Sequence, residues 1–453
     1  MSKLKQWWSD LNSSLWFVPT LMVLAAMLAA YLLVSIDNSN SNKWTADYPL
    51  LFGAGADGAR GMLAAIAGSM ITVAGLIFSL TLSTLAQVSS QYTSRLLRNF
   101  MRDRTNQVVM GFFVSIFVYS LMVLRTIRGG DEGKFVPPIA VSFALVLALV
   151  SIGMLIFFIH HIASSIQAAN IIGRAAKETH EGIARIFPQQ LGNQADSEAQ
   201  EELRVTDMQW YPIQALATGY LQNIDNDGLL EFACDLDVVV RMEHRMGDFV
   251  TEGMPLVSVG YYNEAHQPTA DETHQLNDYF SIGIQRTIDQ QDVAFGFRQI
   301  VDIALKALSP GINDTTTAVM CVDYLGALMA FVATRRLHEP LRASDGRVRV
   351  KAKVRSFEDY VRLAFDQVRG SGDANVAILL RQLTSIQTIV RSTGSYGRRQ
   401  ALRRQCDHIR EAAERALTTE YERNQVQARV AETEALLTKP YLTLGQMVPM
   451  GYE

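Results

Sequence analysis

The feature that most constrains this chain is a set of four apolar stretches, each about long enough to cross a bilayer as a helix. Spanning about 30 Å of hydrocarbon takes about 20 apolar residues, because lipid offers no partner to an unpaired backbone N–H or C=O group. The stretches are residues 15–36, 64–85, 108–124 and 139–159, and no similar run follows residue 160. We therefore expect an α-helical membrane protein with a domain of four transmembrane helices in residues 1–165.

The basic residues that flank these stretches predict the orientation of the helices. Lys3 and Lys5 precede the first stretch, and Arg95, Arg98, Arg102 and Arg104 lie between the second and the third. Short cytoplasmic loops are enriched in Lys and Arg, so we expect both termini in the cytoplasm. The loop after the third stretch is also basic although this orientation places it outside, but four spans still put both termini on one side.

Charge and composition separate the chain into two parts. With 49% hydrophobic and 19% charged residues, the chain is more apolar than a typical soluble protein. Residues 1–165 have a net charge of +4 and the remainder −8. An acidic remainder suits a cytoplasmic region below an anionic membrane surface, and it gives no basic field for nucleic acid. We expect the lipid bilayer as a partner and no nucleic acid.

Small and polar residues recur along the second stretch and its continuation. They are Gly68, Thr72, Gly75, Ser79, Ser83, Gln87 and Ser90. Their spacing of three or four residues places them on one helix face. They can let neighbouring helices approach closely, or they can line a pore. The four stretches contain no Asp, Glu, Lys or Arg, which disfavours active transport because proton-coupled carriers bury such groups in the membrane.

A basic stripe follows the second stretch. Arg95, Arg98 and Arg102 are spaced like one face of a helix, at the expected inner surface of the membrane. They can anchor the helix to phosphate headgroups or form a selectivity ring at a cytoplasmic mouth.

The remainder of the chain is expected to form an α+β region. We place a connecting helix and linker at residues 166–205, a small β-rich, barrel-like module at 206–265 and a mainly helical domain at 266–453. Within the module, residues 214–224 and 238–243 are expected as strands. The segment Gly-Asp-Phe-Val-Thr-Glu-Gly-Met-Pro-Leu-Val at 247–257 resembles the hairpin of biotinyl or lipoyl carrier domains. No lysine lies between Lys177 and Lys306, so a carrier function is excluded.

A possible ligand or ion site surrounds a predicted helix break at Pro310 and Gly311. Its candidate residues are Asp292, Arg298, Asp302, Asn313 and Asp314. Carboxylates and a helix N-terminus can hold an ion, but a capped helix pair with an Arg–Asp network explains the same residues. A polar loop with His266 and His274 is a weaker candidate for a metal site, and we expect neither a metal nor a cofactor.

Two short sequence motifs, together with the four N-terminal spans, resemble those of a known family. The motifs are Leu-Ser-Pro-Gly-Ile-Asn-Asp at 308–314 and Thr-Leu-Ser at 81–83. They are similar to a bacterial family of predicted membrane proteins, domain of unknown function 2254, in which a proline occupies the position of Thr315. The resemblance implies a multi-pass protein of the bacterial inner (cytoplasmic) membrane, with its C-terminal domain in the cytoplasm. It implies no established activity.

The sequence supports two hypotheses for function. No P-loop, H-E-x-x-H or G-x-S-x-G motif occurs, so we do not expect an enzyme. The first hypothesis is a homo-oligomeric channel-like protein with a passive pathway for inorganic ions, lined by the second span and controlled or filtered by the cytoplasmic assembly. The alternative is a membrane-anchored sensor or scaffold that recruits partners without conduction.

Overall fold

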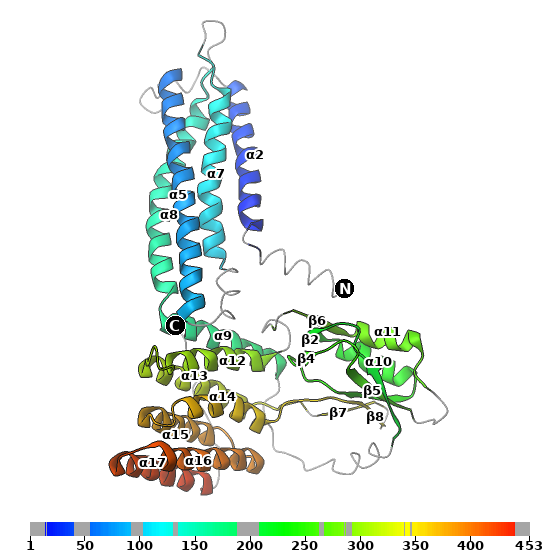
Figure 1. The fold of residues 1–453 in the computed structure, drawn as a ribbon. Helices are drawn as coiled ribbons and strands as arrows, with labels where there is room; N and C mark the ends of the chain where they lie inside the picture. Colours follow the sequence, from blue (N-terminus) through cyan, green and yellow to red (C-terminus); the bar gives the residue numbers. More distant parts are fainter. Residues whose placement is uncertain are drawn as a thin grey trace. The chain divides into compact units, whose positions relative to one another are not determined.

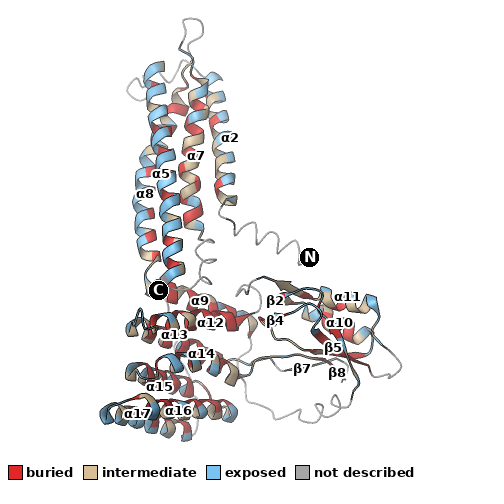
Figure 2. Cartoon of the chain, in the orientation of Figure 1, coloured by how far each residue is buried: buried red, intermediate tan, exposed pale blue. Residues whose placement is uncertain are grey.

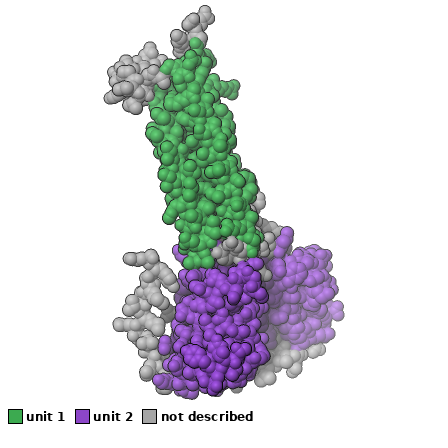
Figure 3. All heavy atoms as spheres, turned by 60° about the vertical axis from the view of Figure 1, so that its left-hand side comes forward, with its two compact units in different colours: residues 1–170 green, residues 171–453 purple. Residues whose placement is uncertain are grey.

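The computed structural model describes residues 14, 16–39, 55–91, 103–129, 135–187, 208–261, 267–284, 286, 292–338, 340–344 and 347–439. The chain forms two compact units, residues 1–170 and residues 171–453 (Figures 1 and 3). Most of the described chain is helical, with a small α/β part in the second unit, as the sequence predicted.

The first unit is a bundle of long apolar helices. They are α2 (Phe17–Ser39), α5 (Ala56–Gln91), α7 (Arg104–Thr126) and α8 (Pro138–Ser165). Helix α7 packs against the other three, and its Phe113, Ile116 and Tyr119 are fully buried. The outward sides of α2 and α8 carry mainly Leu, Val, Ile and Phe, as surfaces in contact with lipid do. Helices α5, α7 and α8 contain the second, third and fourth expected stretches, and α2 covers the first stretch from Phe17 onward.

Carboxylates bind helix N-termini at two places in this bundle. Asp37, only 2% exposed, accepts hydrogen bonds from the backbone N–H groups of Ile139 at 3.2 Å and Ala140 at 3.0 Å. It thereby caps α8 from another helix, since Pro137 supplies no side-chain cap. Asp103 caps α7 and lies 2.9 Å from Nε2 of His161 on α8. Helix α2 extends to Ser39, so Asp37 lies inside it, although the first apolar stretch was expected to end at residue 36.

A fifth helix, α13 (Thr315–Ala333), is also long and apolar enough to cross a membrane. The expectation that no similar apolar run follows residue 160 is therefore wrong. Helix α13 belongs to the second unit, where it packs against α12 (Val293–Ala307), α14 (Phe357–Ser371) and α15 (Val376–Arg391). Its Asp323 forms an ion pair with Arg381 on α15. A helix enclosed by others in a folded core can be as apolar as a membrane span, because both bury nearly all their faces.

The second unit contains two sheets with two short helices beside them. The strands are β1 (Trp210–Gln214), β2 (Gly219–Ile224), β3 (Val238–Met242), β4 (Phe249–Val250), β5 (Pro255–Tyr261), β6 (Phe280–Gly283), β7 (Leu341–Ser344) and β8 (Arg347–Lys351), and the helices are α10 (Asn226–Asp235) and α11 (Ala270–Asp278). One sheet has the order β1-β5-β3-β8-β7 and the other β4-β2-β6. Strand β3 pairs in parallel with β8, whereas the other pairs are antiparallel.

The sheets differ from the expected module in their strands and in their extent along the chain. The single strand expected at 214–224 is two strands, β1 and β2, which lie in different sheets. Strands β6, β7 and β8 come from residues that the sequence analysis assigned to the helical domain, so the boundary expected at residue 265 does not separate the two parts. Parallel pairing of β3 with β8 needs a long connection between the two strands. No local sequence pattern predicts which distant strand will pair with β3.

The remaining helices of the second unit stack as α9 (Ala168–Ile186), α12, α13, α14, α15, α16 (Tyr396–Ala416) and α17 (Glu420–Thr438), with their buried faces towards one another (Figure 2). Arg398, only 9% exposed, fixes the end of α13. Its guanidinium donates to the carbonyl oxygens of Ala333 at 2.6 Å and Arg335 at 2.8 Å. Arg398 therefore acts as a C-terminal cap for α13 within the chain.

This cap gives a prediction about stability. We expect Arg398→Met to lower the free energy of unfolding of the second unit by about 2 kcal/mol or more, because the buried carbonyls at the end of α13 lose a charged donor. The midpoint of thermal unfolding of the purified protein measures the loss. Arg391→Met, at an exposed arginine for which the described chain shows no ion pair, is the matched control. An equal midpoint for both variants would contradict the role of Arg398.

Candidate functional site

The small and polar residues of the second span lie on the exposed side of α5. All seven, from Gly68 to Ser90, are exposed, whereas the opposite side of the helix is buried against the bundle (Figure 2). The buried side consists of Ala59, Leu63, Ile66, Met70, Ala74 and Ile77. A Cβ atom added at Gly68 or Gly75 would meet no atom within 4 Å. The small residues therefore do not serve helix packing within the described part of this chain.

The exposed side of α5 is chemically unlike the exposed sides of α2 and α8. Thr72 Oγ1 donates to the Gly68 carbonyl at 2.8 Å, and Ser90 Oγ donates to the Gln87 carbonyl at 2.9 Å. Such bonds satisfy a hydroxyl without water or a neighbouring helix. Large apolar side chains flank the small residues, with Leu76 61% exposed. The face is thus a narrow row of small residues between apolar ridges, a shape that suits contact with another helix.

The inner-surface arginines cannot be placed. Arg95, Arg98 and Arg102 lie outside the described residues, which resume at Asp103. Their assignment to headgroups or to a selectivity ring stays a prediction.

The five candidate residues of the possible ion site do not come together. Asp292 precedes the first residue of α12, whereas Asp314 follows its far end and caps α13. The 15 residues of α12 separate these ends by about 22 Å. Arg298 pairs with Asp302 at 2.8 Å, one turn along the same helix. Asn313 adopts a left-handed conformation, with φ of 49°, in the turn between the two helices.

Each aspartate has a structural partner. Asp292 accepts from the Phe295 N–H at 3.1 Å and pairs with Arg286 at 2.6 Å. Burial raises the pKa of Asp292 above its ordinary value, and the Arg286 guanidinium opposes that rise. Hydrogen bonds from Thr317, first from its hydroxyl and then from its N–H, hold the pKa of Asp314 below its ordinary value. No group of three His, Cys, Asp or Glu side chains able to hold a metal ion occurs within the described ranges.

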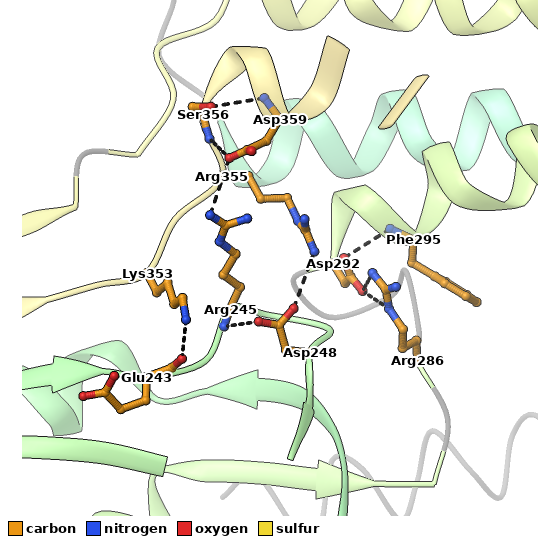
Figure 4. A network of polar contacts seen from close by, with 10 residues as sticks. All are labelled: Glu243, Arg245, Asp248, Arg286, Asp292, Phe295, Lys353, Arg355, Ser356 and Asp359. Atoms are coloured by element: carbon orange, nitrogen blue, oxygen red, sulfur yellow. Dashed lines mark hydrogen bonds and ion pairs between the residues drawn. The ribbon is translucent and has the colours of Figure 1, made fainter. Parts of the chain in front are cut away.

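The pair of Asp292 and Arg286 belongs to a polar network between the sheets and the helices of the second unit (Figure 4). Gly247, with φ of 83°, packs so closely against this pair that a Cβ atom there would clash with both side chains. The glycine of the hairpin thus lets the sheet approach the N-terminus of α12.

Further ion pairs and hydrogen bonds of this network cross the same junction. Asp248 lies 3.8 Å from Arg355, Arg245 lies 3.7 Å from Asp359, and Lys353 Nζ donates to the Glu243 carbonyl at 2.6 Å. These residues were not predicted from the sequence as a group. The only signals were the Gly-Asp pair at 247–248 and the basic segment at 347–355, which lie far apart in the sequence.

Comparison with known proteins supports the resemblance seen in the sequence. The model of a family described as "Predicted membrane protein (DUF2254)" matches residues 12–388. An uncharacterized protein of Mycobacterium tuberculosis (strain CDC 1551 / Oshkosh) is 33% identical over 446 residues, which cover 96% of this chain and 84% of that protein. Uncharacterized proteins of Mycobacterium bovis (strain ATCC BAA-935 / AF2122/97) and Mycobacterium tuberculosis (strain ATCC 25618 / H37Rv) are 32% identical with the same coverage. No solved structure matches the chain.

The cap of α13 can be tested through its titration. We expect Asp314→Ala to lower the free energy of unfolding by about 1 kcal/mol at neutral pH, since it removes an N-cap. Because the folded-state pKa is depressed, the contribution of the carboxylate is complete above about pH 4 and is lost as the pH falls through that pKa. The difference in thermal midpoint between wild type and variant should therefore shrink on acidification. Asp314→Asn, which keeps an acceptor, is the control, and a midpoint unchanged by Asp314→Ala at neutral pH would contradict the cap.

Proposed function

This chain belongs to the DUF2254 family of predicted membrane proteins, and from that premise we propose that it forms a homo-oligomeric, channel-like assembly in the bacterial inner membrane. In this proposal α2, α5, α7 and α8 span the membrane, both termini are cytoplasmic, and the second unit forms the cytoplasmic assembly that controls or filters the pathway. The observation that carries the proposal is the exposed row of small and polar residues on α5.

The occupant of this face is a second copy of the same chain. Lipid gains nothing from a row of Gly, Ser and Thr, whereas these residues let helices of neighbouring subunits approach. Copies arranged around a common axis bring the α5 faces together, and hydroxyls and small side chains can then line a pathway without closing it. The row contains no ionisable residue, which favours passive movement of inorganic ions over coupled transport.

We assign α13 to the core of the cytoplasmic unit and not to the membrane. Its Asp323 pairs with Arg381, and Arg398 binds its last carbonyls. A helix in lipid would leave such charged partners without water. Four spans then keep both termini on the same side of the membrane.

A sensor or scaffold without conduction is the second candidate. The observation that favours it is that the Thr72 and Ser90 hydroxyls donate hydrogen bonds to carbonyl groups of their own helix. A face whose hydroxyls already have hydrogen-bond partners can pack against another subunit without water.

A cysteine scan of α5 distinguishes a wet face from a packed one. Single cysteines are placed on the row at Thr72, Gly75, Ser79 and Ser83, and as matched controls at Ile71, Leu76, Phe78 and Leu80. The native Cys234, Cys321 and Cys406 are replaced first. We expect a charged thiol reagent to modify the row and not the controls, because the reactive thiolate forms only in contact with water. Protection of all eight positions in the purified oligomer would rule out an aqueous pathway.

Conduction itself is tested by recording currents from the purified protein in planar bilayers. We expect discrete steps in current, and replacement of Gly75 by a bulky Leu should abolish them because the side chain fills the pathway. Leu76→Phe, on the flanking ridge, should keep them. If the wild-type protein passes no current under tension, under voltage or with different ions, the hypothesis of a sensor or scaffold is favoured.

A further inference from the structure

The second unit contains a cavity of about 400 Å³ at the junction between its sheets and its helices. The described lining is strongly basic. Its cationic side chains are Arg185, Arg245, Arg342, Lys353 and Arg355, with His338 beside them. The single acidic residue of that lining is Asp292, which is already bound to Arg286.

The positive charge around this cavity exceeds what the neighbouring carboxylates can neutralise. Asp359 and Asp248 lie 3.7 Å and 3.8 Å from Arg245 and Arg355, longer than a hydrogen bond. Arg185, Arg342 and Lys353 form no ion pair with any residue that the structure describes. A concave surface with an excess of cations concentrates anions.

Two donors of these arginines are buried without a partner. The Nε atoms of Arg245 and Arg342 are inaccessible to solvent and make no hydrogen bond to a described residue. Burying such a donor is unfavourable unless something accepts its hydrogen bond. Guanidinium groups present several donors in a fixed plane that match the oxygens of a phosphate.

The same cavity also has an apolar wall. Phe187, Met242, Val293 and Tyr360 contribute to it. Tyr360 is only 5% exposed and lines the cavity. A tyrosine hydroxyl is protonated at neutral pH and can donate a hydrogen bond, and burial raises the pKa of Tyr360 further. Aromatic and apolar side chains beside a basic cluster accommodate a ligand with a charged head and an apolar or planar body.

We propose that this cavity binds a small phosphorylated compound of about the size of a mononucleotide. Arg245, Arg342 and Lys353 hold the phosphate, and the wall formed with Phe187 and Tyr360 receives the rest of the molecule. A cavity of about 400 Å³ lies within the range of small-molecule sites. The proposal does not depend on conduction by the α5 face, because every residue that it uses lies in the second unit.

Binding is tested on the full-length protein in nanodiscs of uncharged, zwitterionic phosphatidylcholine. The probes are adenosine 5′-monophosphate, inorganic pyrophosphate and, as the control without phosphate, adenosine. Calorimetric titration should show binding of the two phosphate compounds and none of adenosine. Absence of binding of both phosphate probes at millimolar concentration, or equal binding of adenosine, would overturn the proposal.

Substitutions locate the binding site. Arg342→Gln and Lys353→Gln should each raise the Kd for both phosphate probes about tenfold or more, because each removes a charge-assisted hydrogen bond. Tyr360→Phe should raise the Kd for adenosine 5′-monophosphate, although it leaves the charge of the cavity unchanged. Arg391→Gln makes the same charge change at an exposed arginine away from the cavity and should bind like wild type. Equal affinities for Arg342→Gln, Lys353→Gln and Arg391→Gln would show that the cavity is not the site.

A repeat in nanodiscs that contain phosphatidylglycerol identifies the source of the phosphate. Loss of adenosine 5′-monophosphate binding there, together with binding of phosphatidylglycerol that Arg342→Gln weakens in a lipid-binding assay, identifies a lipid headgroup. Unchanged binding identifies a soluble compound. Both results keep the phosphate site.

Discussion

Carboxylates at helix N-termini are the interaction on which much of this structure depends. Each helix begins with backbone N–H groups that have no partner inside the helix, and a carboxylate there binds them and offsets the positive end of the helix dipole. The helices capped in this way are α7, α8, α10, α12 and α13, by Asp103, Asp37, Asp225, Asp292 and Asp314. Two of the five also join helices of the first unit, since Asp37 reaches from α2 to α8 and Asp103 contacts His161 on α8. The caps therefore set both where helices start and which helices meet.

The helix bundle leaves one face of one helix without a partner. Helix α7 lies among α2, α5 and α8 and takes up their large apolar side chains, so α5 needs only one side for the core. Its other side is exposed, and a Cβ atom added there at Gly68 or Gly75 would meet no atom within 4 Å. This division of α5 explains how a single helix can hold the bundle together and offer an interface to a second subunit.

The junction inside the second unit has the opposite character. There the sheet and the helices meet through charged side chains, with Gly247 close to the pair of Asp292 and Arg286. A junction made of ion pairs is less tightly packed than an apolar core, and in this case it encloses a basic cavity. The cations that line it come from both sides of the junction, Arg342 from β7 of the sheet and Arg185 from α9, so a phosphorylated ligand could contact both. Binding and the alignment of the two parts would then be linked.

The sequence alone determined what depends on local periodicity and composition. The long apolar helices of the first unit and the shared face of Gly68 to Ser90 follow from length, composition and spacing within one helix, and the structure contains both features. Only the tertiary structure decided which side of α5 is buried, that α13 lies in a helical core, and that Asp292 and Asp314 lie at opposite ends of α12. It also decided the pairing of β3 with β8 and the gathering of Arg245, Arg342 and Lys353 around one cavity. These features depend on contacts between residues far apart in the chain, and hydrophobic periodicity records which side of a segment is apolar but not which distant segment will cover it.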